Sequence, residues 1–203
     1  FVWYPVKTSD GTEGYVASSY LDYITFNDIP RDYEYKKEIY YLAERNIING
    51  VEPNRFGLGQ GLTRWQAVLM LNRVKEVSLA NRPDPGFTDV PKTHKNYHDI
   101  AAAVDAGLFN GTSPTTFEPD RILTRGEMAT VLQRIYDFPA PSSKHPFTDV
   151  KDEWFAESVA SLYASGITKG VSDYEFRPYS TITREQFAIF LARSMGETFR
   201  VTK

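Results

Sequence analysis

Apolar residues recur at helical spacing in six segments of the chain, and these segments alternate between two types. Each segment of the first type ends at a residue that tolerates a left-handed conformation. An apolar residue then follows, as in a Schellman-type helix end. The three stripes with their ends are Ile39, Leu42, Ala43 and Asn46–Ile47; Ile100, Ala103, Val104 and Gly107–Leu108; and Val159, Leu162, Tyr163 and Gly166–Ile167. The pattern predicts three short helices that each bury one face.

Segments of the second type start with a helix-capping signal. A threonine is followed three positions later by Glu or Gln, which is the capping-box pattern. The three starts are Thr63-Arg64-Trp65-Gln66, Thr124-Arg125-Gly126-Glu127 and Thr183-Arg184-Glu185-Gln186. No single helix can bury its own apolar stripe, so we expect three equivalent helices to share a core.

The two types of segment belong to one repeat that occurs three times. Phe26-Asn27-Asp28, Phe87-Thr88-Asp89 and Phe147-Thr148-Asp149 open the copies at spacings of 61 and 60 residues. Asn49-Gly50, Asn110-Gly111 and Lys169-Gly170 follow at matching offsets. We predict a mainly α fold, with three helix-loop-helix repeats in pseudo-threefold arrangement around a central three-helix bundle. We expect a monomer with an internal pseudo-trimer, and we expect a short β segment at the N-terminus from the pattern of residues 1–24.

Turn-forming residues separate the repeats and set the expected boundaries. Residues 81–86 and 138–143 are rich in proline and other breakers, so we place the repeats at 25–80, 81–140 and 141–203. In residues 1–24, Val2–Val6 and Gly14–Ala17 predict strands around the turn Ser9-Asp10-Gly11. The stretch Trp3–Leu21 resembles the C-terminal half of a bacterial SH3-like domain. Half of a small barrel is not stable alone, so either its other half lies upstream or the segment packs on the helices.

Composition narrows the classes of function. Of the 203 residues, 41% are hydrophobic and 24% charged, and the net charge of −3 argues against a nucleic-acid partner. No apolar run approaches the roughly 18 residues of a membrane helix. The absence of cysteine excludes disulfides and agrees with an exported protein. Phe1–Val6 lacks the features of a signal peptide, so we expect an interior or C-terminal part of a longer protein. His94 and His98 have no evident third ligand, and we predict neither a metal site nor a cofactor.

An arginine at the first position of each second helix needs an explanation. Arg64, Arg125 and Arg184 lie where the helix dipole mildly disfavours a cation. Free N–H groups of a first turn form an anion site, and a guanidinium beside them suits a carboxylate or phosphate. The sequence therefore suggests an anion pocket at the start of each second helix. The alternative is structural: each arginine could instead pair with Asp28, Asp89 or Asp149.

The ordered landmarks resemble the S-layer homology family. They are the Phe-x-Asp start, the glycine after the first helix, the loops Phe117-Glu118-Pro119 and Phe176-Arg177-Pro178, and the Thr-Arg-x-Glu-type helix start. The resemblance covers about residues 26–199. It implies a three-repeat pseudo-trimer that binds secondary cell-wall polysaccharide through a pyruvyl ketal on N-acetylmannosamine. The ketal carboxylate would bind at Arg64, Arg125 and Arg184.

The resemblance also implies groove residues around each arginine. These are Asn49, Gly50, Asn110, Gly111, Lys169 and Gly170, with the aromatic side chains of Tyr97 and Trp154, and with Asp28, Asp89 and Asp149 as structural or ligand-binding acids. Trp65 could line a groove or cover the bundle. The first repeat departs most from the pattern, because its loop lacks Phe-x-Pro and its aromatic is uncertain between Tyr33 and Tyr35. We therefore expect ligand binding at the second and third sites more than at the first.

Three functions compete. The leading hypothesis is an extracellular, non-covalent anchor to the bacterial cell wall, without catalysis in this chain. An SH3-like neighbour favours a larger cell-wall hydrolase, such as an amidase or endolysin, as the anchored protein. The other two are an anchor of a lattice-forming S-layer protein and a glycoside hydrolase acting on wall polymers. A hydrolase needs two carboxylates in one cleft, and the acids here repeat with the scaffold or scatter.

Overall fold

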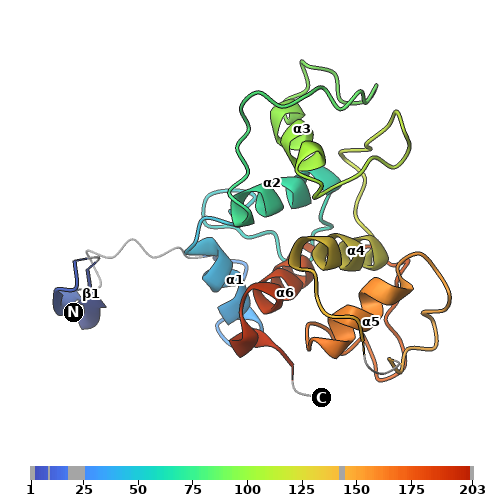
Figure 1. Cartoon of the computed structure of the whole chain (residues 1–203). Coiled ribbons are helices and arrows are strands. Elements are labelled where there is room, and N and C mark those ends of the chain that lie inside the picture. The colour runs from blue at the N-terminus through green and yellow to red at the C-terminus, as the bar shows by residue number, and fades with distance from the viewer. Residues whose placement is uncertain (1–2, 9, 18–25, 142–144, 202–203) are drawn as a thin grey trace.

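The computed structural model describes residues 3–8, 10–17, 26–141 and 145–201. Strands β1 (Trp3–Lys7) and β2 (Glu13–Ala17) pair antiparallel, with Trp3 opposite Ala17. This confirms a short β segment at the N-terminus, although Val2 and Ser9 of the predicted strand and turn lie outside the described residues. Figure 1 shows the hairpin apart from the helices. Its likeness to an SH3 domain stays a prediction.

The rest of the described chain is mainly helical, as predicted. The helices are α1 (Lys36–Ala43), α2 (Arg64–Val74), α3 (Tyr97–Asp105), α4 (Arg125–Tyr136), α5 (Ala156–Ala164), α6 (Arg184–Met195) and the 3-10 turn η2 (Glu197–Phe199). Among the residues that the structure describes, no helix is long and apolar enough to cross a membrane.

Local sequence determines where the helices begin and end. A capping box starts α2, α4 and α6, with Thr63, Thr124 and Thr183 as the caps. The first helices end in left-handed residues, namely Asn46 (φ 56°), Gly107 (φ 70°) and Gly166 (φ 71°). The next amide then bonds back to the last turn, from Ile47 to Leu42, from Leu108 to Ala103 and from Ile167 to Leu162. These are the predicted Schellman-type ends.

Each first helix packs on a second helix of a different repeat. The main helix contacts join α3 to α2, α5 to α4 and α1 to α6, so the last pair brings the two ends of the helical region together. Figure 1 shows these three pairs arranged around a common centre. Among the second helices themselves, α4 and α6 are also in contact. A repeat therefore buries its apolar stripes against its neighbours.

A ring of main-chain hydrogen bonds closes the centre. The Leu62 amide donates to the Ile182 carbonyl at 3.0 Å, the Ile182 amide to Leu123 at 2.9 Å, and the Leu123 amide to Leu62 at 3.0 Å. All three side chains are fully buried. The residues before the second helices thus join the three repeats directly, and this ring sets the start of every second helix.

Candidate functional site

The arginine that begins each second helix is buried against the neighbouring repeat. Only 4% of each of these residues is exposed. The Nε of Arg64 donates to the Phe117 carbonyl at 2.7 Å, that of Arg125 to Phe176 at 2.7 Å, and that of Arg184 to Phe56 at 3.1 Å. The guanidinium carbon lies 4.6, 4.6 and 5.3 Å from the centroid of the same phenylalanine ring. Each arginine therefore holds a loop of another repeat.

The repeated aspartates hold the same loops from the other side. Asp28 accepts from the amides of Phe56, Gly57 and Leu58, Asp89 from Phe117 and Glu118, and Asp149 from Phe176 and Arg177. One phenylalanine in each loop is thus bonded through its N–H to an aspartate of its own repeat and through its carbonyl to an arginine of the neighbour. The direct arginine–aspartate pairs considered from the sequence do not form within the described residues.

The N–H groups of the first helical turn are already bonded to protein. The amides of Arg64, Arg125 and Arg184 donate to the carbonyls of Arg121, Ser180 and Gln60, each at 2.9 Å. The next amides of two helices, those of Trp65 and Gly126, donate to Pro119 and Pro178. The prediction of an anion site made from free first-turn N–H groups is therefore wrong for these groups. A main-chain segment of the neighbouring repeat occupies them instead.

The guanidinium groups remain charged despite their burial. Burial lowers the pKa of Arg64 and of Arg125 to about 10, and it lowers the pKa of Arg184 as well. A group with such a pKa is protonated at neutral pH. Each of these arginines therefore places a fixed positive charge next to a loop of the neighbouring repeat.

A cavity of about 280 Å³, called groove 1 here, opens beside Arg184. It is lined by Asn49, Gly50, Val51, Trp65, Gln66, Leu69, Met70, Arg73 and Arg184. The Arg184 guanidinium donates to the Asn49 carbonyl at 2.8 Å. Trp65, whose place the sequence left open, lines this groove, and Lys95 Nζ lies 4.9 Å from its ring centroid. The lining of groove 1 thus comes from the first and third repeats, and Lys95 of the second repeat lies against its tryptophan.

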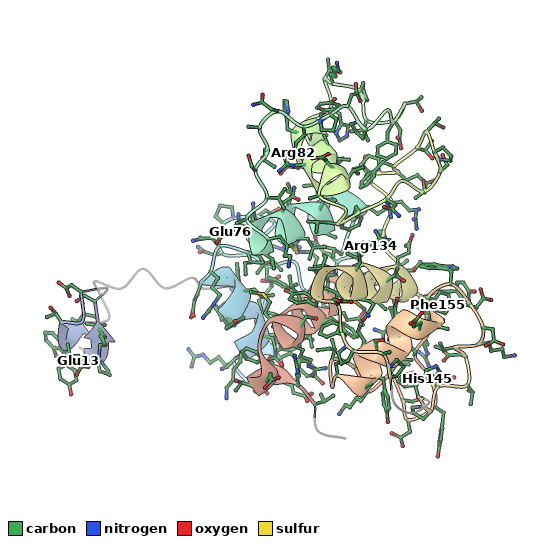
Figure 2. The ribbon with its side chains drawn as sticks, in the orientation of Figure 1. Glu13, Glu76, Arg82, Arg134, His145 and Phe155 are labelled. Atoms are coloured by element: carbon green, nitrogen blue, oxygen red, sulfur yellow. The ribbon has the colours of Figure 1, made fainter. Side chains whose placement is uncertain are left out.

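A larger cavity of about 470 Å³, called groove 2, opens beside Arg64. It is lined by Arg64, Phe109, Asn110, Gly111, Thr112, Arg121, Glu127, Thr130, Val131, Arg134 and Trp154. The Arg64 guanidinium donates to the Asn110 carbonyl at 2.8 Å. Trp154 comes from the third repeat and is 61% exposed. In Figure 2, Arg134 on α4 and Phe155 at the start of α5 mark the two elements beside this groove.

The place in the third repeat that is equivalent to grooves 1 and 2 is called location 3 here. There Arg125 lies beside the loop of the third repeat. Of the residues predicted there, Lys169 lines a separate cavity of about 400 Å³ with Tyr163 and Tyr174. Gly170 packs closely, because an added Cβ would lie 2.5 Å from the Ser172 carbonyl oxygen. Gly50 and Gly111 have the same restriction, at 2.5 and 2.4 Å from main-chain oxygens. Close packing is thus one reason for a glycine at all three positions.

Tyr97, the other aromatic predicted to line a groove, lies elsewhere. It is the first residue of α3, is 7% exposed, and is absent from the linings of grooves 1 and 2. The position that corresponds to Trp154 is Lys95, because the Ile100 amide bonds to Asn96 as the Val159 amide bonds to Phe155. Counting along the sequence therefore placed the aromatic two residues too late.

A second set of arginines was missed in the sequence. Arg73, Arg134 and Arg193 each follow the motif arginine by nine residues. Each donates to a carbonyl just after a first helix, namely that of Ile47, Leu108 and Ile167. Arg73 lines groove 1 and Arg134 lines groove 2. Their constant offset was visible in the sequence and could have identified them.

Comparison with known families decides what these repeats are. A family model described as S-layer homology domain matches residues 25–67, 86–129 and 146–188. The chain belongs to the S-layer homology family. The matched segments end inside the second helices, so each match contains the aspartate, the loop and the motif arginine of one repeat. The recognition made from the landmarks is confirmed for all three repeats.

Several relatives carry the same region within longer proteins. The chain is 30% identical over 84% of its length to S-layer protein sap of Bacillus anthracis, of which it covers 21%. It is 26% identical over 88% of its length to an uncharacterized cell wall amidase of the same species, covering 33% of that protein. It is 26% identical over 73% of its length to a cellulosome-anchoring protein of Acetivibrio thermocellus, covering 35%. The chain thus spans about a fifth to a third of these relatives. The family and the relatives indicate a surface-anchored, extracellular protein, and the chain itself is an anchoring module.

Proposed function

We propose that this S-layer homology module anchors a protein by binding an anionic cell-wall polysaccharide in its grooves, with a pyruvyl ketal on N-acetylmannosamine as the recognised group. One observation carries the proposal: grooves 1 and 2 each combine a buried arginine, an exposed arginine and a tryptophan. A planar guanidinium binds a carboxylate through two parallel hydrogen bonds. A tryptophan face packs against the apolar C–H groups of a sugar ring.

The exposed arginines are the groups that reach the ligand first. Arg73 and Arg134 lie on the solvent side of their grooves, while Arg184 and Arg64 use their Nε and one terminal nitrogen on loop carbonyls. The ketal carboxylate therefore binds Arg73 or Arg134 and the remaining donors of the buried arginine. This assignment gives the motif arginines two roles, one in holding the loop and one at the inner end of the groove.

Several grooves that each bind weakly can together attach one molecule firmly. A polymer that fills one groove raises the effective concentration of its other units at the next groove, which strengthens the overall binding without any new contact. Anchoring needs no catalysis, and the one carboxylate that lines groove 2, Glu127, is already paired with Arg121 at 3.1 Å. The paired-carboxylate arrangement of a glycoside hydrolase is thus not met in that cavity.

The anchored protein is a cell-wall hydrolase in our proposal. The match to a cell wall amidase covers 88% of this chain. An anchor keeps such an enzyme at its insoluble substrate. Anchoring of a lattice-forming S-layer protein is the alternative, and electron microscopy of the full-length protein tests it, because a lattice former assembles into sheets.

Calorimetric titration with purified secondary wall polysaccharide tests the binding proposal. We expect native polymer to bind and chemically depyruvylated polymer to bind at least about tenfold more weakly. Arg73→Gln in the same assay should weaken binding of native polymer. The matched control is Arg45→Gln, which removes an exposed arginine that stacks on Tyr41. Equal binding of both polymers would refute recognition of the ketal.

A further inference from the structure

The three second helices differ at the position that follows the motif arginine. This residue is Trp65 in α2, Gly126 in α4 and Glu185 in α6. Trp65 lines groove 1. Gly126 leaves room for the neighbouring repeat, because an added Cβ would lie 3.0 Å from the Phe155 ring. Glu185 brings a carboxylate to the start of α6, where its Oε2 accepts from the Gly59 amide at 2.9 Å.

The residue that faces this position lies in the segment just before each first helix. The first helical hydrogen bonds run to Tyr35, Asn96 and Phe155, which makes the preceding residues Glu34, Lys95 and Trp154 equivalent. Because α3 packs on α2, α5 on α4 and α1 on α6, the facing pairs are Lys95 with Trp65, Trp154 with Gly126, and Glu34 with Glu185. Grooves 1 and 2 therefore each receive one tryptophan, and location 3 receives two carboxylates.

The surroundings of Tyr33 support this placement of the two glutamates. Burial raises the pKa of Tyr33 to about 12, and the negative charges of Glu185 and Glu34 act in the same direction. A location with two carboxylates repels an anionic ligand.

The second arginine of location 3 is covered. Arg73 and Arg134 are exposed, whereas Arg193 is 8% exposed although it makes the same hydrogen bond to a loop carbonyl. The Tyr35 ring centroid lies 5.6 Å from its guanidinium carbon. The segment after α6 also packs there, because Arg200 Nε donates to the Arg193 carbonyl. The guanidinium that would meet a ligand first is thus inside the protein.

We infer that the anionic wall glycan occupies grooves 1 and 2 only, and that location 3 is closed by Tyr35 and by the carboxylates of Glu34 and Glu185. This inference rests on the proposed function. It reverses the order expected from the sequence, which favoured the second and third sites over the first. The module is then a two-site binder, and location 3 joins the ends of the helical region.

The stoichiometry of a ligand with a single binding unit gives the number of binding sites per chain. In calorimetry with the methyl glycoside of pyruvylated N-acetylmannosamine, we expect two equivalents to bind per chain. Arg73→Gln and Arg134→Gln should each leave one equivalent, and the double variant should bind none. Arg45→Gln should still bind two. Three equivalents for the unchanged chain, or one equivalent retained by the double variant, would overturn the inference.

Chemical labelling tests the closure without any ligand. Butanedione should modify Arg73 and Arg134 in the folded chain and leave Arg193 unmodified, as read by mass spectrometry of peptides. In Tyr35→Asn, which copies Asn96, Arg193 should become reactive. If the glycoside does not bind the unchanged chain, the proposed ligand is wrong, and the labelling still decides whether location 3 is closed. Equal labelling of Arg193 and Arg73 in the unchanged chain would show that it is open.

Discussion

The two sets of arginines on the second helices differ in what surrounds them. Arg125 and its equivalents are almost fully buried and bonded to loop carbonyls, whereas Arg73 and Arg134 are exposed and line the grooves. Both sets recur in all three repeats. Recurrence therefore does not separate the two sets. Burial identifies the residues that the scaffold requires, and exposure identifies those that are available to a ligand. The following substitutions test this contrast, in order of decreasing effect.

Loss of a buried arginine should have the largest effect on stability. Arg125→Ala removes the 2.7 Å bond to the Phe176 carbonyl and leaves that carbonyl without its donor. We expect the free energy of unfolding to fall by about 3 kcal/mol. Arg134→Ala, nine residues later on the same helix, should change it by less than about 0.5 kcal/mol. Urea denaturation followed by circular dichroism measures both, and similar losses would erase the contrast.

A methyl group at a loop glycine should have the next largest effect. In Gly111→Ala the new Cβ would lie 2.4 Å from the Ser113 carbonyl oxygen and 2.6 Å from the Phe87 ring. The loop must shift, and we expect the free energy of unfolding, measured by thermal or urea denaturation, to fall by about 2 to 3 kcal/mol. Gly196→Ala is the control, because its nearest neighbour would be at 3.4 Å and its φ is −141°. A stable Gly111→Ala that no longer binds glycan would mean that the glycine serves the ligand alone.

Asp28 should make stability depend on pH. Burial raises the pKa of Asp28, but bonds from the amides of Leu58, Phe56 and Gly57 outweigh it, so the net pKa is lowered. A carboxyl with a lowered pKa in the folded state stabilises the protein above its unfolded pKa of about 3.9, and this contribution is lost as the pH falls through the folded value. Asp28→Asn should reduce stability at pH 7 by about 2 kcal/mol. Near pH 2 the variant and the unchanged chain should converge, and a constant difference between them would contradict this explanation.

The acid of groove 2 should have the smallest effect. Glu127 pairs with Arg121 at 3.1 Å and lies 3.7 Å from Arg64, at a position where the other repeats have glutamine. Glu127→Gln keeps a residue able to complete the capping box, as Gln66 does in α2. We expect the free energy of unfolding, measured by urea denaturation, to fall by about 1 kcal/mol, since the pair is only partly buried. A loss as large as that of Arg125→Ala would place Glu127 in the scaffold instead of the groove.

Sequence reasoning succeeded where the decisive interactions are local. The capping boxes at Thr63, Thr124 and Thr183 and the left-handed ends at Gly107 and Gly166 depend on residues within a few positions of each other, and the structure has them as predicted. Such signals can be read from one segment, because the helix terminus has few ways to satisfy its free backbone groups.

The partners of each helix could not be read in this way. Periodicity shows which face of α1 is buried, but it does not show that the face packs on α6, at the other end of the helical region. For the same reason, the acceptors of Arg64 were unpredictable, since Phe117 and Asn110 belong to the next repeat. The position of Trp154 in a groove followed from the family resemblance, while its true counterpart, Lys95, required the hydrogen bonds of the folded chain.

The ring through Leu62, Leu123 and Ile182 has a consequence for how such modules can grow. Each of these three residues donates its amide to one neighbouring repeat and accepts at its carbonyl from the other, so the third hydrogen bond returns to the first repeat. Stacked solenoids stay open at both ends and can gain or lose copies one at a time. A closed ring leaves no end to which a fourth copy could add, and the loss of one copy breaks two of its three links. Three copies are therefore the number that completes the ring in this module.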